Sequence, residues 1–167
     1  MNRILLLVIV LFFNSITVSA QENNFVLKAE ISKINYVPKQ FFGTWSVLST
    51  RTSTDSEKTF AQQSVDLWNL RRSGNVIELR NPVTTAVAEI YLEDVTDKEI
   101  VFTHYEKDGN TLLKDTVKLT IGKDTFVGTN IIKLETRSKD SEGRPVLKTK
   151  YATYNLKGTK VSGLGLY

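Results

Sequence analysis

Lys114-Asp115-Thr116-Val117-Lys118-Leu119-Thr120-Ile121 carries the clearest structural signal in the chain. Val117, Leu119 and Ile121 fall at every second position, and polar side chains stand between them. This spacing places the apolar residues on one face of an extended strand, whereas a helix would need them three or four positions apart. The segment therefore predicts a β-strand with one buried face and one face in water.

The same two-residue alternation recurs along most of the chain. In residues 98–107, for example, Ile100, Phe102 and His104 share one face. Turn-forming residues such as Asp108-Gly109-Asn110 separate the alternating segments. We expect eight strands, at residues 43–52, 63–72, 75–81, 84–94, 98–107, 110–121, 124–137 and 145–157.

Most connections between these strands are short enough for hairpins, so neighbours in sequence should be neighbours in the sheet. Such a meander predicts an all-β, eight-stranded antiparallel up-and-down barrel, because closure removes unpaired strand edges. An antiparallel two-sheet sandwich is the alternative. Residues 25–36 also alternate, so the N-terminal segment, residues 21–37, adds a ninth strand or covers the barrel domain formed by residues 38–167.

The N-terminus has the three parts of a secretory signal peptide. Arg3 charges the start, residues 4–13 are uninterrupted apolar side chains, and Val18-Ser19-Ala20 offers small or modest side chains for cleavage. A retained anchor would need about 20 apolar residues. We expect residues 1–20 to be removed and Gln21 to begin an exported chain, periplasmic or secreted, without integral membrane insertion.

The composition removes several classes of chemistry. The 167-residue chain has no cysteine and one histidine, which argues against disulfides, cysteine-held zinc or iron–sulfur centres and most catalytic triads. Its 22 basic and 18 acidic side chains are interspersed, as on a solvated surface and unlike a nucleic-acid interface. The sequence holds no familiar catalytic motif. We expect no enzymatic activity, metal, cofactor or nucleic-acid partner.

A short motif stands at the start of the first expected strand. Phe41, Gly43 and Trp45 match the Phe-x-Gly-x-Trp motif of lipocalins and related calycin β-barrels, so the chain resembles these proteins. The resemblance implies a 3₁₀ turn at the barrel base, a glycine that permits a sharp turn into the strand, and a tryptophan packed across the closed end. Lipocalins usually set an arginine against this tryptophan; the matching place offers Lys157 or Lys160, and we take Lys157 as the motif residue.

Six residues are candidates for contact with a ligand inside the barrel. His104 and Asn130 would supply the few polar groups that orient a ligand, and Ala88 leaves space where a bulky residue would fill the core. Each also has a purely structural interpretation, since such side chains on an apolar face usually belong to the core. The set is Trp68, Ala88, Phe102, His104, Asn130 and Tyr154.

Three functions remain open from the sequence. The leading one is an exported binding protein that holds a small apolar or amphipathic ligand in its barrel. The second is a non-enzymatic structural or interaction protein whose barrel is filled by its own side chains. The third, a small outer-membrane barrel, conflicts with charged outer faces that lipid would penalise, at Lys114, Lys118, Glu89 and Glu93.

Any ligand should enter at the end opposite Trp45. Because the strands run alternately up and down, four connections meet at that end. These are the loops at residues 53–58, 81–84, 108–109 and 138–144.

Overall fold

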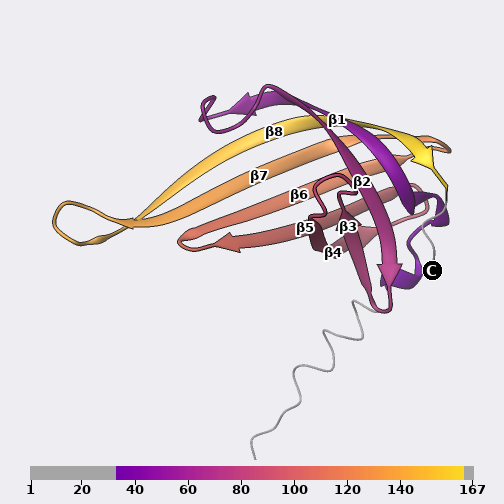
Figure 1. Cartoon of the computed structure of the whole chain (residues 1–167), viewed down its shortest axis with the longest axis horizontal. Coiled ribbons are helices and arrows are strands. Elements are labelled where there is room, and N and C mark those ends of the chain that lie inside the picture. The colour runs from indigo at the N-terminus through magenta and orange to yellow at the C-terminus, as the bar shows by residue number, and fades with distance from the viewer. Residues whose placement is uncertain (1–32, 164–167) are drawn as a thin grey trace, which may run out of the picture.

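A computed structural model describes residues 33–163, which form a closed all-β barrel (Figure 1). Each strand pairs antiparallel with the next, and the last strand pairs with the first. This confirms the up-and-down barrel and rules out the two-sheet sandwich. The elements are η1 (Lys39–Phe41), β1 (Gly43–Thr54), β2 (Gln63–Ser73), β3 (Val76–Arg80), β4 (Val87–Val95), β5 (Glu99–Asp108), β6 (Thr111–Ile121), β7 (Thr125–Lys139) and β8 (Pro145–Ser162).

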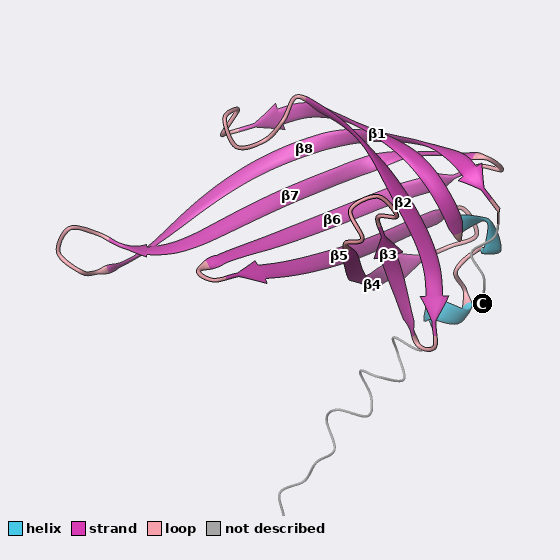
Figure 2. Cartoon of the chain, viewed as in Figure 1, coloured by secondary structure: helices cyan, strands magenta, loops and turns pink. Residues whose placement is uncertain are grey.

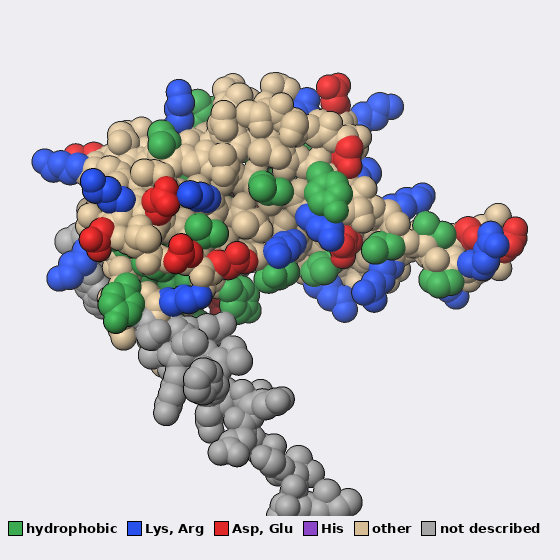
Figure 3. All heavy atoms as spheres, turned by 180° about the vertical axis from the view of Figure 1, so that it is seen from behind, with side chains coloured by type: hydrophobic (Ala, Val, Ile, Leu, Met, Phe, Trp, Pro, Cys, Tyr) green, Lys and Arg blue, Asp and Glu red, His purple; other side chains and the backbone are tan. Residues whose placement is uncertain are grey.

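The alternation of apolar and polar residues in the sequence corresponds to inward and outward positions on the barrel wall. On β6, Val117, Leu119 and Ile121 are buried, while Lys118 and Thr120 are exposed. Neighbouring strands follow the same rule, so the apolar faces meet inside. Charged side chains of both signs are interspersed with apolar ones on the outer face that Figure 3 shows.

One strand begins later than the alternation suggests. β4 starts at Val87, not at residue 84, because the preceding residues form a turn. The Asn81 side-chain oxygen accepts the backbone N–H groups of Val83 and Thr84 at 2.8 and 3.0 Å, and Thr85 has a φ of 62°. Asparagine side chains favour such turns over an extended strand.

One end of the barrel is closed by aromatic side chains, and this base is taken as its lower end. Phe41 and Trp45 are fully buried, and the Trp45 Nε1–H donates to the Phe41 carbonyl at 2.9 Å. Gly43 has a φ of +127°, a conformation that L side chains rarely adopt, so a glycine is needed between η1 and β1. The 3₁₀ turn, the glycine and the sealing tryptophan all lie where the sequence motif placed them.

The cation beside Trp45 is Lys160, which corrects the choice of Lys157. Lys160 Nζ lies 4.9 Å from the centre of the Trp45 ring and donates to the Gln40 carbonyl at 2.9 Å. Lys157 is exposed on the outer face of β8, whereas its neighbour Leu156 is buried and points inward. The two lysines are three positions apart, so they point to opposite faces of the strand and only one of them can face the barrel base.

The wall of the barrel is much shorter at β3 and β4 than at β7 and β8 (Figure 2). β3 has 5 residues and β4 has 9, whereas β7 has 15 and β8 has 18. The β4–β5 pairing extends upward only to Tyr91 and Thr103, and the β2–β3 pairing only to Asn69 and Arg80. Residues 104–108 of β5 therefore pair with β6 alone, which leaves the upper barrel without a ladder between β4 and β5.

The N-terminal segment is described only from Lys33 onward. Residues 33–35 form one helical turn and not a strand. Lys33 Nζ donates to the Glu93 carbonyl at 2.7 Å, and Arg72 Nη2 donates to Asn35 Oδ1 at 3.1 Å. This part of the segment therefore covers the barrel wall. The expected leader, residues 1–20, and the rest of the alternating stretch, residues 25–32, lie outside the described residues.

Candidate ligand-binding cavity

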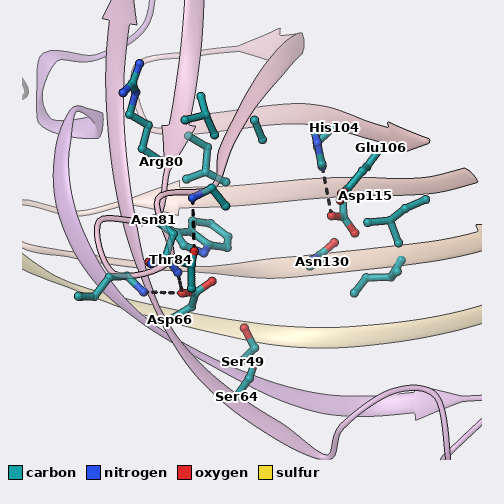
Figure 4. Close-up of a pocket in the computed structure, with 18 of the residues that line it drawn as sticks. Ser49, Ser64, Asp66, Arg80, Asn81, Thr84, His104, Glu106, Asp115 and Asn130 are labelled. Carbon is teal, nitrogen blue, oxygen red and sulfur yellow. Dashed lines mark hydrogen bonds and ion pairs between the residues drawn. The ribbon is translucent and has the colours of Figure 1, made fainter. Parts of the chain in front are cut away.

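A cavity of about 770 Å³ occupies the upper part of the barrel, away from Trp45 (Figure 4). All eight strands and the β3–β4 turn contribute lining side chains, which point inward above the aromatic core or stand at the rim of the cavity. The polar ones are Ser49, Ser64, Asp66, Arg80, Asn81, Thr84, Glu89, His104, Glu106, Asp115 and Asn130, and the others are Leu67, Trp68, Leu79, Ala86, Val87, Ala88, Tyr105, Leu113, Ile132 and Tyr154.

The cavity exists because the inward positions change in size along the strands. In the lower half, large buried side chains such as Phe102, Phe126 and Leu119 fill the barrel. Higher up, β1 and β4 present Ser49 and Ala88 at inward positions. Small side chains on facing strands leave volume that no neighbour fills.

Trp68 lies between the packed core and the cavity. Its ring stacks on Phe126 with the centroids 6.0 Å apart, and Phe126 in turn packs on Trp45 at 5.1 Å. Trp68 also lines the cavity and is half-buried. The aromatic column that seals the base therefore ends in an indole that a ligand could contact.

Three polar side chains meet on one wall of the cavity. His104 on β5 and Asp115 on β6 are register partners, and His104 Nδ1 lies 3.6 Å from Asp115 Oδ2 (Figure 4). Asn130 enters from β7 at an inward position. Asp115 Oδ1 and Asn130 Oδ1 are both buried and have no hydrogen-bond partner among the described residues.

One rim loop is tied to the barrel interior. The Tyr154 hydroxyl donates to the Ala61 carbonyl at 2.9 Å, and burial raises the pKa of that phenol. Arg51 donates to the Phe60 carbonyl and, at 2.9 Å, to Gln62 Oε1. The loop between β1 and β2 is thus anchored at the cavity mouth.

The next part of the rim is held by the β3–β4 turn. The Asn81 side-chain amide donates to Asp66 Oδ1 on β2. Outside the barrel, Glu78 accepts Arg80 Nε and Arg71 Nε, each at 2.8 Å, and these hydrogen bonds, led by that of Arg80, lower the pKa of the Glu78 carboxyl. Hydrogen bonds therefore fix the short hairpin below the opening.

The cavity opens to the side as well as to the top. Glu89 and Tyr105 occupy outward positions on β4 and β5, and both are exposed, yet both line the cavity. This is consistent with the missing ladder between the two strands above Tyr91 and Thr103. The side opening lies over the low hairpin formed by β3 and β4.

Five of the six residues that the sequence singled out line this cavity: Trp68, Ala88, His104, Asn130 and Tyr154. Phe102 does not. It is 1% exposed, and its ring centroid lies 6.3 Å from that of Phe41 in the core. Phe102 shares the inward face of β5 with His104, but it stands lower, where large side chains already fill the barrel.

The sequence missed the acidic residues of the lining, above all Asp115. Alternation places Asp115 on the inward face of its strand. Its role becomes visible only when its partner on the neighbouring strand, His104, is known. Three of the four expected entrance loops, at residues 53–58, 108–109 and 138–144, contribute no lining residue. The β5–β6 and β7–β8 hairpins carry the last two loops beyond the cavity, and the β7–β8 hairpin projects furthest (Figure 1).

Residues 33–163 hold no group of three or more histidine, cysteine, aspartate or glutamate side chains placed to bind a metal ion. Nor does this part of the chain contain a helix with the length and apolar character that membrane passage requires. Comparison with protein-family models, with curated proteins and with solved structures gave no significant match.

Proposed function

We propose that the protein is an exported, lipocalin-like binding protein that holds one small amphipathic molecule in the barrel cavity. The observation that carries this proposal is the cavity of about 770 Å³. Small-molecule sites are typically about 300 to 1,000 Å³ in volume, with apolar walls and a few placed polar groups. A barrel filled by its own side chains, the alternative function, would leave no space of this size.

The lipocalin-like part of the proposal is supported by the base of the barrel. The 3₁₀ turn, Gly43 and Trp45 occupy the arrangement that the motif implies, and Lys160 stands where that family places a cation. The closed eight-stranded barrel is the architecture in which such proteins hold ligands. The proposal of export rests on the leader-like residues 1–20 alone.

The distribution of charge supports a barrel that works in water and not in an outer membrane. Paired charges stand on the outer wall, among them Lys118 with Glu99 at 3.2 Å and Lys133 with Glu135. Apolar side chains fill the lower interior. A membrane barrel needs the reverse arrangement, with an apolar band outside.

The proposal is tested by titrating the mature chain, residues 21–167, with a fluorescent apolar probe and with fatty acids, retinoids and haem. Saturable binding of at least one compound is expected. Ala88→Leu should weaken that binding because it fills the cavity, whereas Val127→Leu, on the exposed outer wall, should leave it unchanged. If no compound binds, or if Ala88→Leu binds as well as the wild type, the cavity is not a binding site.

Export is tested separately by expressing the full chain in its host and fractionating the cells. The expected product begins at Gln21 and is recovered from the periplasm or the medium. Recovery of the uncleaved chain from the cytoplasm would contradict the proposal, as would a cleaved product that resists extraction from the outer membrane.

A further inference from the structure

The polar wall of the cavity has hydrogen-bond acceptors without donors. Asp115 Oδ1 and Asn130 Oδ1 are buried and unpartnered among residues 33–163. Buried polar oxygens in folded proteins are nearly always hydrogen-bonded, and those that are not call for a specific explanation. Both side chains border the cavity, and the Asp115 side chain is 21% exposed, so a turn of its carboxylate would present the unpartnered oxygen to a donor on a bound molecule.

Two donors that line the cavity, His104 and Tyr154, do not supply the missing hydrogen bonds. His104 Nδ1 stands 3.6 Å from Asp115 Oδ2, which is longer than a hydrogen bond and involves the other carboxylate oxygen. The Tyr154 hydroxyl is already engaged with the Ala61 carbonyl. Neither side chain therefore satisfies Asp115 Oδ1 or Asn130 Oδ1.

The charged side chains that line the cavity are mostly acidic. Four carboxylates line it, from Asp66, Glu89, Glu106 and Asp115, against one arginine, Arg80. Arg80 directs its Nε to Glu78 outside the cavity, at 2.8 Å. A concave site with an excess of one sign of charge favours a ligand of the opposite sign.

We propose that the bound molecule carries a positively charged nitrogen with N–H donors, such as a primary ammonium group, and that this group docks at Asp115 and Asn130. Its apolar part then lies against Trp68, Leu79 and Ile132. This inference rests on the proposed binding function and names the chemical class of its ligand: a small amphipathic amine.

A competing arrangement would remove one of the two unpartnered acceptors without a ligand. If the Asn130 amide rotated by half a turn, its NH₂ group would take the place of Oδ1 and present a donor to the polar wall. The cavity would then have less reason to prefer a donor. The two arrangements predict different ligand preferences, which makes them separable.

The test uses three ligands with the same tail: octylamine, octanol and octanoate. Each is titrated into the mature chain near neutral pH in competition with a fluorescent apolar probe. Octylamine should bind at least ~10-fold more tightly than octanol, because a charge-assisted hydrogen bond to a buried acceptor is worth about that factor or more. Octanoate should bind more weakly than octanol.

Variants then locate the preference. Asp115→Asn should bring octylamine down to the affinity of octanol and leave octanol unchanged, while Asn130→Asp should increase the preference for octylamine. Glu106→Gln, at the exposed rim, is the matched control and should reduce the preference far less than Asp115→Asn. Thermal unfolding of each variant reports whether it folds, and if Asp115→Asn does not, Asn130→Asp decides the question.

The outcomes separate this inference from the binding function itself. If neither the probe nor any octyl compound binds, the binding function fails. If all three bind equally, if octanoate binds best, or if the amine preference persists in folded Asp115→Asn, the cavity binds ligands but does not select an amine. A preference for octylamine that disappears with Asp115 supports the inference.

Discussion

The ring of Phe126 on β7 lies directly over Gly158, its register partner on β8. A Cβ atom at Gly158 would overlap the ring edge, and Phe126 itself is 2% exposed. The absence of a side chain at Gly158 thus leaves the space that the Phe126 ring occupies. This pair links the aromatic column of Trp45, Phe126 and Trp68 to the wall of the barrel.

Gly158→Ala should therefore destabilise the protein by about 1 to 3 kcal/mol, the usual cost of adding a methyl group to a packed core. Chemical denaturation measures this cost. In a Phe126→Leu background the same change should cost less, because the ring that blocks the methyl group is gone. Gly163→Ala is the control, since a Cβ there meets no atom within 4 Å. Strictly additive effects of the two substitutions would contradict the steric relationship.

Trp45→Ala should lower the free energy of unfolding by about 3 to 5 kcal/mol, because it removes a fully buried indole and leaves a cavity. Val127→Ala, at an outer position that is 55% exposed, should change it by less than about 1 kcal/mol. Urea titration of the two variants checks both values. A loss below about 1 kcal/mol for Trp45→Ala would show that the base is not sealed by this residue.

Lys160→Met and Lys157→Met distinguish the two lysines. Lys160→Met should destabilise by about 0.5 to 1 kcal/mol, because it removes the cation over the Trp45 ring and the donor to Gln40. Lys157→Met should be close to neutral, because Lys157 is exposed on the outer face. Equal effects in thermal unfolding would argue against the contact with Trp45.

Hydrogen exchange should reveal the unpaired upper edge of β5. Alternate amides within residues 104–108 point away from β6, toward a side where β4 offers no partner. These amides should exchange much faster than those of Ile100 and Phe102, which lie between two ladders. Two-dimensional NMR of residues 21–167 in deuterated buffer gives the rates. Equal protection along the whole of β5 would mean that the side opening is closed in solution.

The phenol of Tyr154 should make stability fall at alkaline pH. Burial raises its pKa above the ordinary tyrosine value, so the folded state favours the neutral form. The stability that this shift contributes is fully present at a pH below the ordinary tyrosine pKa, and it is lost as the pH rises through the raised pKa of Tyr154. Between about pH 9 and about pH 11, the wild type should therefore lose more stability than Tyr154→Phe.

Urea unfolding at the two pH values provides this comparison, and the absorbance of ionised tyrosine provides a second. One tyrosine should ionise later than the others in the wild type, and that late transition should be absent from Tyr154→Phe. Identical losses of stability in the two proteins would contradict the assignment.

Much of the site follows from the period-two alternation. It placed Ala88, His104, Asn130 and Tyr154 on inward faces, and each lines the cavity. It could not give the height of a residue within the barrel, which is why Phe102 belongs to the packed core and not to the cavity. Height depends on how far each strand is staggered against its neighbours, and local spacing carries no information about stagger.

The sequence alone determined the strand order, the inward faces and the sealed base, because alternation, short turns and the Phe41–Gly43–Trp45 pattern are local properties of the chain. The tertiary structure decided which lysine covers Trp45, which carboxylate faces His104 and where the wall opens. These depend on register between strands distant in sequence: Lys160 meets Trp45 and Asp115 meets His104 only through pairing across the sheet. The side opening arises because β4 and β5 stop pairing at Tyr91 and Thr103, a limit that depends on how the two strands are staggered against each other.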